Sequence, residues 1–96
     1  MVYTPKTSSK FNSIKKMLPG KLRNAIDDQA RLICEDPSLG SLKTGDLAGV
    51  RVHKFGFLGT LYLLAYEVNE DAKLIYIYAI GGHEKFYRDL KEYLKS

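Results

Sequence analysis

Hydrophobic positions in the first third of the chain recur at the spacing of helices. Phe11, Ile14 and Leu18 lie three and four residues apart, and they follow Ser8 and Ser9, which are suitable N-caps. A Pro-Gly pair interrupts the pattern, and a second run of helical spacing extends to about residue 35. The pattern predicts two helices joined by a tight turn. We also expect a short extended strand over residues 1–6, because a residue that precedes proline disfavours helix.

The period changes from helical to alternating after about residue 47. Residues 50–53 alternate between apolar and polar, and the runs 61–68 and 73–80 are apolar on both faces, which is typical of central strands. The short turns at 56–59 and 69–71 favour antiparallel neighbours. Apolar residues near 86–94 then return to helical spacing and predict a C-terminal helix over 83–95.

These elements predict an α+β fold: a helical hairpin packed on a three- to four-stranded antiparallel sheet, with a C-terminal helix. The 96 residues are expected to form one domain, 1–96. Because side chains alternate along a strand, we expect Val50 and Val52 to pack on the helices. Arg51 and His53 would then look out from the opposite, concave side.

Composition excludes several classes of protein. A hydrophobic content of 45% supports a packed core, and the single cysteine, Cys34, excludes an internal disulfide framework and a cysteine-cluster zinc site. The sequence shows neither a membrane-spanning run nor the apolar core of a secretion signal, so we expect a cytoplasmic protein with no membrane partner.

The charge is uneven along the chain. The net charge is +4, but residues 1–26 contain six Lys and Arg and no acid, and acids begin at Asp27. This asymmetry could create a local positive field for a polyanion, or it could be a solvated helix face.

The chemistry-bearing residues gather around a strand end. His83 follows two glycines at the end of the last predicted strand, Tyr87 lies one helical turn further on, and His53 shares a predicted face with Arg51. Imidazole, cationic and phenol groups suit metal-free RNA cleavage. A base takes the ribose 2′-hydroxyl proton, cations stabilise the phosphorane, and an acid protonates the leaving oxygen. Further cations that could bind phosphate are Lys43, Lys54 and Lys85.

Each of these residues also has a plainer interpretation. Either histidine could be structural or merely exposed, Arg51 could pair with Asp46, and Tyr87 could belong to the core. The strand tyrosines are interpreted chiefly as sheet packing; they are Tyr62, Tyr66, Tyr76 and Tyr78. Two histidines without a clear carboxylate partner do not make a metal site, and no cofactor motif is present, so we expect neither a metal nor a cofactor.

Three segments resemble the RelE/ParE superfamily of bacterial type II toxins. They are Gly45-Asp46-Leu47-Ala48-Gly49-Val50-Arg51-Val52-His53-Lys54, Leu61-Tyr62-Leu63-Leu64-Ala65-Tyr66-Glu67-Val68 and Ile80-Gly81-Gly82-His83-Glu84. They are similar to the family's leucine-x-glycine strand entry, its leucine-x-tyrosine central strand and its isoleucine-glycine-x-basic strand end. The order of helices and strands fits as well, and the resemblance covers nearly the whole chain.

The positions of His83 and Tyr87 look most like YafQ-type mRNA interferases. That resemblance implies His83 as the leading acid/base, His53 as its partner, and Arg51 and Lys54 as phosphate-binding groups. Tyr87 would orient a base or assist proton transfer. The chain departs from the family at Leu63, where RelE carries an arginine, and it lacks the carboxylate that YafQ-type enzymes place after their strand histidine.

The resemblance implies a toxin of a type II toxin–antitoxin system. The first hypothesis is an endoribonuclease that cleaves mRNA at or away from the ribosome, inhibits translation and is neutralised by a cognate antitoxin in a hetero-oligomer. A ParE-like protein that poisons DNA gyrase without nuclease chemistry is the alternative, since one fold serves both. A third possibility is an inactive toxin fold that survives as an interaction module.

Overall fold

The computed structural model describes residues 3–82 and 86–95. Within these residues, three α-helices and five strands follow one another, with two short 3-10 turns before β2 and β3. In order they are β1 Thr4–Thr7, α1 Ser9–Lys16, α2 Gly20–Glu35, η1 Pro37–Leu39, β2 Ser41–Leu42, η2 Gly45–Leu47, β3 Arg51–Phe57, β4 Thr60–Asn69, β5 Leu74–Gly82 and α3 Phe86–Lys95.

The strands form one sheet in the order β1-β5-β4-β3-β2. The predicted α+β fold is confirmed, but the sheet has five strands and is mixed, because β1 pairs parallel with β5 while the other neighbours are antiparallel. The long connection from β1 through both helices permits this parallel pairing. Pro5 fits in β1 because β1 is an edge strand, where a missing N–H need not interrupt the sheet.

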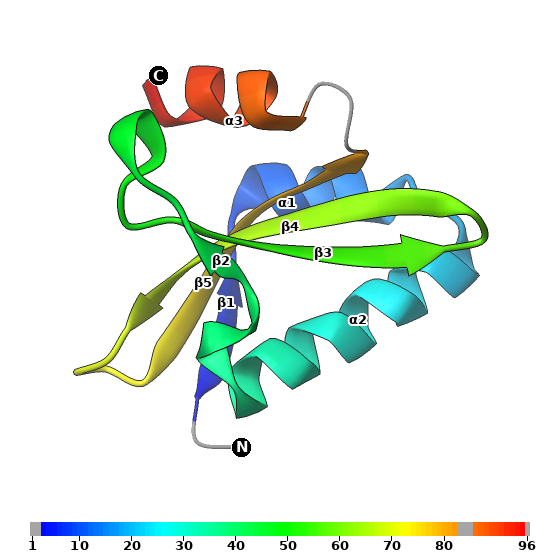
Figure 1. The fold of residues 1–96 in the computed structure, drawn as a ribbon. Helices are drawn as coiled ribbons and strands as arrows, with labels where there is room; N and C mark the ends of the chain where they lie inside the picture. Colours follow the sequence, from blue (N-terminus) through cyan, green and yellow to red (C-terminus); the bar gives the residue numbers. More distant parts are fainter. Residues whose placement is uncertain (1–2, 83–85, 96) are drawn as a thin grey trace.

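The sheet has a hydrophobic core on each face (Figure 1). We call the face covered by α1 and α2 the hairpin face, and the face crossed by α3 the α3 face. The hairpin-face core contains Phe11, Leu22, Ile26, Ile33, Cys34, Phe55, Leu64, Tyr66, Ile75, Ile77 and Ile80. The α3-face core contains Leu47, Val50, Val52, Leu63, Ala65, Tyr78, Phe86 and Leu90.

The faces of β3 are the reverse of the prediction. Val52 packs in the α3-face core, whereas His53 and Phe55 lie on the hairpin face with their rings stacked, 6.4 Å between centroids. Alternation was interpreted correctly, but both faces of this sheet are covered. Apolar residues therefore do not tell which face meets the hairpin. Phe55 packs in the hairpin-face core beside Tyr62, and alternation along β3 places His53 on the same face.

A bulge in β5 shifts which residues face α3. Ala65 pairs with Ala79, but Tyr66 pairs with Ile77, so Tyr78 is the extra residue of the bulge. Tyr78 and Ala79 consequently both pack on the α3-face core, while Ile77 and Ile80 pack on the other face.

Candidate functional site

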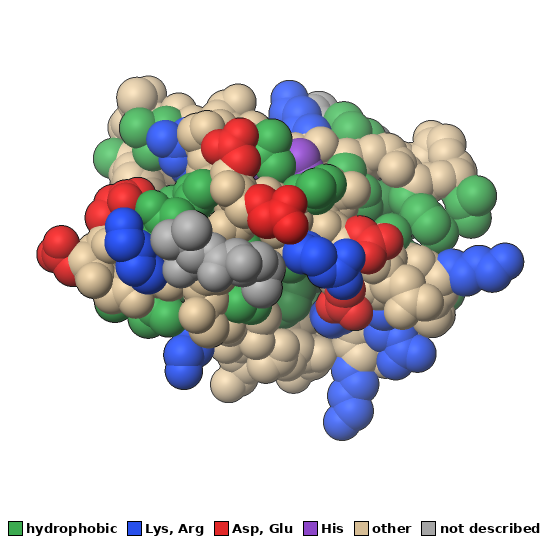
Figure 2. Space-filling model, turned by 90° about the horizontal axis from the view of Figure 1, so that it is seen from below, with side chains coloured by type: hydrophobic (Ala, Val, Ile, Leu, Met, Phe, Trp, Pro, Cys, Tyr) green, Lys and Arg blue, Asp and Glu red, His purple; other side chains and the backbone are tan. Residues whose placement is uncertain are grey.

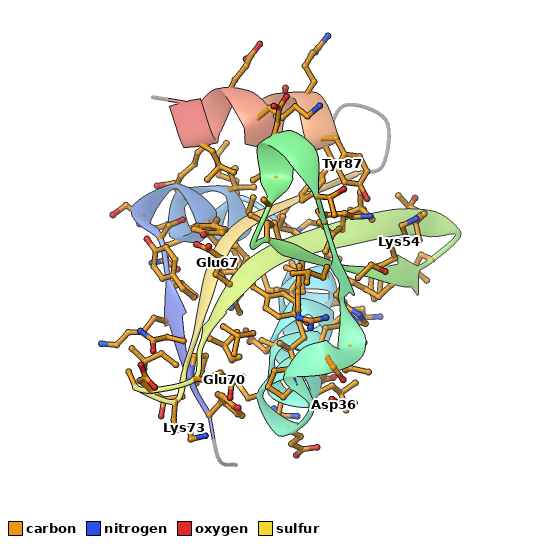
Figure 3. All side chains as sticks on the ribbon, turned by 60° about the vertical axis from the view of Figure 1, so that its left-hand side comes forward. Asp36, Lys54, Glu67, Glu70, Lys73 and Tyr87 are labelled. Carbon is orange, nitrogen blue, oxygen red and sulfur yellow. The ribbon has the colours of Figure 1, made fainter. Side chains whose placement is uncertain are left out.

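Lys54 and the end of β5 lie in one row across the α3 face. The pairing register places Lys54 opposite Leu63, and Leu63 opposite Gly81. Lys54 is exposed, and it is labelled in Figure 3. A Cβ at Gly81 would lie 3.2 Å from Phe86 Cδ1, so glycine lets α3 pack closely over the strand end. The row therefore presents a solvated cation two strands away from the residues that precede His83.

Tyr87 and Lys43 are brought together on the same face. Lys43 Nζ lies 5.4 Å from the centroid of the half-buried Tyr87 ring, a cation–π contact. The backbone N–H of Lys43 donates to the Val50 carbonyl at 2.9 Å, which fixes the lysine beside β3. An ion pair between Lys91 and Asp46, 3.8 Å long, links α3 to η2 on the surface. The structure thus places the predicted residues Lys43 and Tyr87 side by side.

His53 occupies a different environment from the predicted one. Its Nε2 lies 2.6 Å from Oε1 of Gln29 on α2, and the ring is half-buried on the hairpin face. Burial lowers the pKa of His53 below its ordinary value, because the charged imidazolium loses solvation. The expectation that His53 looks out from the concave side is therefore wrong, and the structure does not place it with Lys54 or Tyr87.

Arg51 also turns towards the hairpin face, where it supports the backbone. Its Nη1 donates to the Gly40 carbonyl at 2.8 Å, and the Gly40 N–H donates to the hydroxyl of Tyr66 at 2.9 Å. That hydroxyl donates in turn to the Pro37 carbonyl at 2.6 Å. The ion pair of Asp46 is with Lys91 and not with Arg51. Arg51 was predicted to bind phosphate on the outward side, but its observed contacts are structural.

Two predicted residues, His83 and Lys85, lie outside the described residues. Leu63, which the family resemblance aligns with an arginine of RelE, is fully buried in the α3-face core. The described site candidates on the α3 face are thus Lys54 on β3 and the neighbouring pair Lys43 and Tyr87, and we call these three residues the polar rim.

Two exposed residues of the same face were not predicted as site residues. Glu67 is exposed on β4, and Tyr76 is 40% exposed on β5, whereas Tyr66 and Tyr78 are buried. All four strand tyrosines had been interpreted as sheet packing. Tyr62 and Tyr66 lie on the hairpin face, and Tyr78 shares the α3 face with Tyr76 but is buried in the α3-face core. Alternation carries no signal for how much of that face α3 covers.

The positive N-terminal region is broken up by neighbouring acids. Lys15 pairs with Asp27 across the hairpin, and Arg31 pairs with Asp28 at 3.0 Å. Seen from the side of α2, acidic side chains lie among the basic ones (Figure 2). On this face the asymmetry in sequence therefore does not produce a uniform basic patch.

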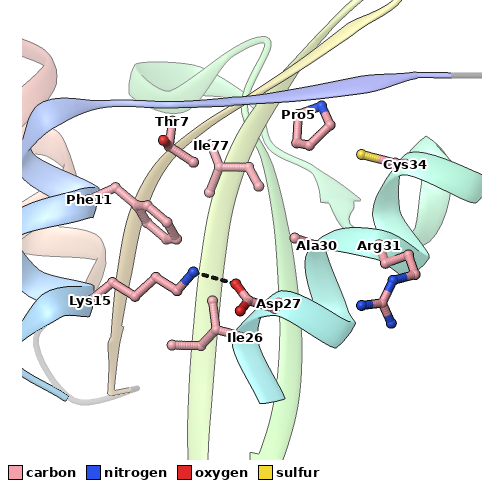
Figure 4. Close-up of a pocket in the computed structure, with 10 residues that line it drawn as sticks. All are labelled: Pro5, Thr7, Phe11, Lys15, Ile26, Asp27, Ala30, Arg31, Cys34 and Ile77. Atoms are coloured by element: carbon pink, nitrogen blue, oxygen red, sulfur yellow. Dashed lines mark hydrogen bonds and ion pairs between the residues drawn. The ribbon is translucent and has the colours of Figure 1, made fainter. Parts of the chain in front are cut away.

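One pocket lies on the hairpin face, away from this site. It has a volume of about 230 Å³ and lies between β1, α1 and α2, with Phe11, Ile26 and Ile77 in its lining (Figure 4). The Lys15–Asp27 ion pair is part of that lining. Among residues 3–82 and 86–95, no helix is long and apolar enough to span a bilayer, and no group of three or more His, Cys, Asp or Glu could hold a metal ion.

The fold is shared with solved toxin structures. The RelBE2 toxin–antitoxin complex from Mycobacterium tuberculosis matches with a TM-score of 0.76 at 20% identity, covering 86% of this chain and 100% of that chain. A doubly substituted free E. coli toxin RelE matches with a TM-score of 0.75 at 15% identity, covering 99% and 98%. The archaeal RelE–RelB complex from Pyrococcus horikoshii matches with a TM-score of 0.64 at 20% identity, covering 88% and 99%. These likenesses define a RelE-type α+β fold.

A family model assigns the chain more narrowly. The model of the ParE-like toxin of type II bacterial toxin–antitoxin systems matches residues 6–91. The chain therefore belongs to this family, and it is a toxin of the RelE/ParE superfamily. No curated protein sequence matches it.

Proposed function

We propose that this toxin is a metal-independent endoribonuclease that cleaves mRNA and thereby inhibits translation. The observation that carries the proposal is the row from Lys54 through Leu63 to Gly81. Neighbouring strands are about 4.8 Å apart, so the backbones at Lys54 and Gly81 are about 10 Å apart. An RNA phosphate bound by the exposed Lys54 ammonium would lie on the same face of the sheet as the end of β5, after which His83 follows in the sequence.

The catalytic roles follow from the chemistry of the groups. His83, two positions after Gly81, takes the proton from the ribose 2′-hydroxyl and gives a proton to the leaving 5′-oxygen. Lys54 neutralises charge on the phosphorane, with Lys85 as a second cation. Tyr87 stacks on a base or assists proton transfer, and Lys43 beside it binds a neighbouring phosphate. His53 faces the hairpin, so we assign it no proton transfer in this scheme.

A cognate antitoxin is the proposed partner. Four of the matching structures are complexes of a RelE-type toxin with its antitoxin or with an antitoxin peptide, and this chain shares their fold. The chain carries a net charge of +4, which favours an acidic protein that covers the basic rim in a hetero-oligomer. When released, the same rim would be free for mRNA, at the ribosome or away from it.

A second candidate function is inhibition of DNA gyrase without cleavage. The observation that favours it is Leu63, because an apolar residue that is fully buried under α3 cannot stabilise a phosphorane. The family model is also ParE-like by name. If the toxin inhibits gyrase, the polar rim binds a protein target. Transcripts should then stay intact, and plasmid supercoiling should fall.

Substitution of Lys54 tests the proposal. Induced expression of the wild-type chain should stop growth and fragment transcripts. Lys54→Ala should slow cleavage about 100-fold, the typical loss when one transition-state donor is removed. Lys16→Ala is the matched control, because Lys16 is exposed on α1 and belongs to the other side of the sheet. Cleavage by Lys54→Ala at the wild-type rate would contradict the assignment of Lys54.

A further inference from the structure

The α3 face is only partly covered. α3 crosses the half of the sheet near the end of β5, while the half of β4 and β5 near their connecting turn extends beyond it (Figure 1). On that open half the register places Lys6 of β1 opposite Tyr76, and Tyr76 opposite Glu67 of β4. We call these three side chains the exposed row. Figure 3 shows Glu67 on β4, well away from α3.

Tyr76 is the flat centre of the exposed row. Its ring is 40% exposed and meets the buried Tyr78 edge-on, with centroids 5.0 Å apart and planes at 88°. An edge-to-face contact holds the Tyr76 ring at a defined angle against a rigid support. A preorganised aromatic ring on an open sheet is the arrangement on which single-stranded nucleic acid bases stack.

The two flanking residues have complementary chemistry. Directly opposed residues on neighbouring strands have Cβ atoms about 5 Å apart, so a base over Tyr76 lies within reach of both Lys6 and Glu67. Within the part of the chain that the structure describes, neither side chain makes an ion pair. The Lys6 ammonium is suited to a phosphate. The Glu67 carboxylate accepts two hydrogen bonds, and guanine alone among the RNA bases offers two adjacent donors, N1–H and N2–H.

We propose that the exposed row binds one nucleotide of single-stranded RNA, with guanine preferred. The site deepens the proposed function, on which it rests: it lies on the same face as the candidate catalytic rim, five residues before Gly81 on β5. At about 3.3 Å per residue, the separation is about 16 Å, which a few nucleotides of extended RNA cover. A guanine bound on Tyr76 would thus fix the position of the scissile bond.

The occupant is a nucleotide rather than a protein because of the size and polarity of the row. A stable protein interface buries about 800 Å² on each partner and has an apolar centre. The exposed row offers one aromatic ring between two charged side chains, which is enough for a base and its phosphate.

Binding of short labelled RNAs tests this site separately from cleavage. Fluorescence anisotropy would compare uridine hexamers that carry one guanosine, inosine or adenosine, using wild-type protein and variants with intact folding by circular dichroism. Tyr76→Ala and Tyr76→Leu should both bind about 10-fold more weakly, equivalent to about 1.4 kcal/mol, and Tyr76→Phe should bind as the wild type does. Lys6→Ala should weaken binding to every hexamer and reduce the salt slope by about 1, whereas Lys16→Ala should not.

Specificity provides the second readout. The wild type should prefer guanosine over inosine, which lacks the N2 amino group, and Glu67→Gln should lose that preference. Equal affinity of Tyr76→Leu and wild type, or no guanosine preference in the wild type, would overturn the site. Cleavage that persists unchanged in Tyr76→Leu with the same product ends would overturn it while leaving the nuclease proposal intact. Guanosine-selective binding without any cleavage would support the site and contradict the nuclease.

Discussion

At the scale of single residues, the hairpin face shows how histidine can be structural. The His53 ring is stacked on Phe55 and its Nε2 meets the Gln29 side-chain oxygen, so a polar group is satisfied at the margin of a core. The sequence identified His53 as a candidate because of its residue type. Its partner Gln29, on a helix 24 positions away, could not be anticipated from alternation.

This environment makes stability depend on pH. Burial lowers the pKa of folded His53 below 6.5, its ordinary value, so the unfolded chain takes up the proton first as pH falls. Neutral His53 therefore makes its full contribution to the free energy of unfolding above about pH 7. The free energy of unfolding decreases as the pH falls through about 6.5, because the unfolded chain then binds the proton more strongly. Urea titrations at about pH 8 and about pH 5.5 measure this change. Between the two pH values, the free energy of unfolding should fall more for wild type than for His53→Gln. An equal fall in the free energy of unfolding in the two proteins would show that His53 does not cause the pH dependence.

At the scale of elements, the helices were the most predictable parts. Ser8 was predicted as a cap, and its hydroxyl accepts from the Phe11 N–H at 3.0 Å. Both predicted helices of the hairpin were found, and the second ends at Glu35. β2 could not be predicted because two residues carry no period. The parallel pairing of β1 with β5 could not be predicted, because it depends on how the helices and strands between them are arranged in space.

Ser8 does more than cap α1. The buried hydroxyl also donates to the Tyr78 carbonyl at 2.9 Å, which ties the start of α1 to β5. Ser8→Ala should therefore reduce the free energy of unfolding by about 2 kcal/mol, more than the typical loss of a cap alone. The matched control is Ser9→Ala, since Ser9 is exposed in the first turn of the same helix and should change stability by less than about 0.5 kcal/mol. Chemical denaturation measures both, and equal losses would show that the bond to β5 is not stabilising.

At the scale of the whole molecule, the sheet is buried on both faces where α3 crosses it. The α+β fold class followed from the order of periodic segments. The reversed faces of β3 did not, because each face has its own core and the sequence distinguishes them only through side-chain volume. The same burial fits the leucine at the position that the family resemblance aligns with an arginine of RelE, because Leu63 packs in one core with Phe86 and Leu90 of α3.

A pair of arginine substitutions tests this packing. Leu63→Arg would place an unpaired charge in the α3-face core and should cost about 3–5 kcal/mol, either unfolding the chain or detaching α3. Leu61→Arg lies two residues earlier on the same strand and face, where the side chain is 41% exposed, and should be nearly neutral. Thermal unfolding followed by circular dichroism separates them. A stable Leu63→Arg protein with α3 in place would contradict the described core.

The central claim is that this toxin cleaves RNA through His83. Its most direct test is a cell-free translation reaction that contains EDTA-treated toxin. Primer extension maps the 5′ ends of the transcript. Supercoiling by gyrase is assayed with the same toxin preparation. We expect new 5′ ends with the wild-type chain, none with His83→Ala, and unchanged gyrase activity with both. Intact transcripts together with blocked supercoiling, or cleavage by His83→Ala at the wild-type rate, would contradict the account.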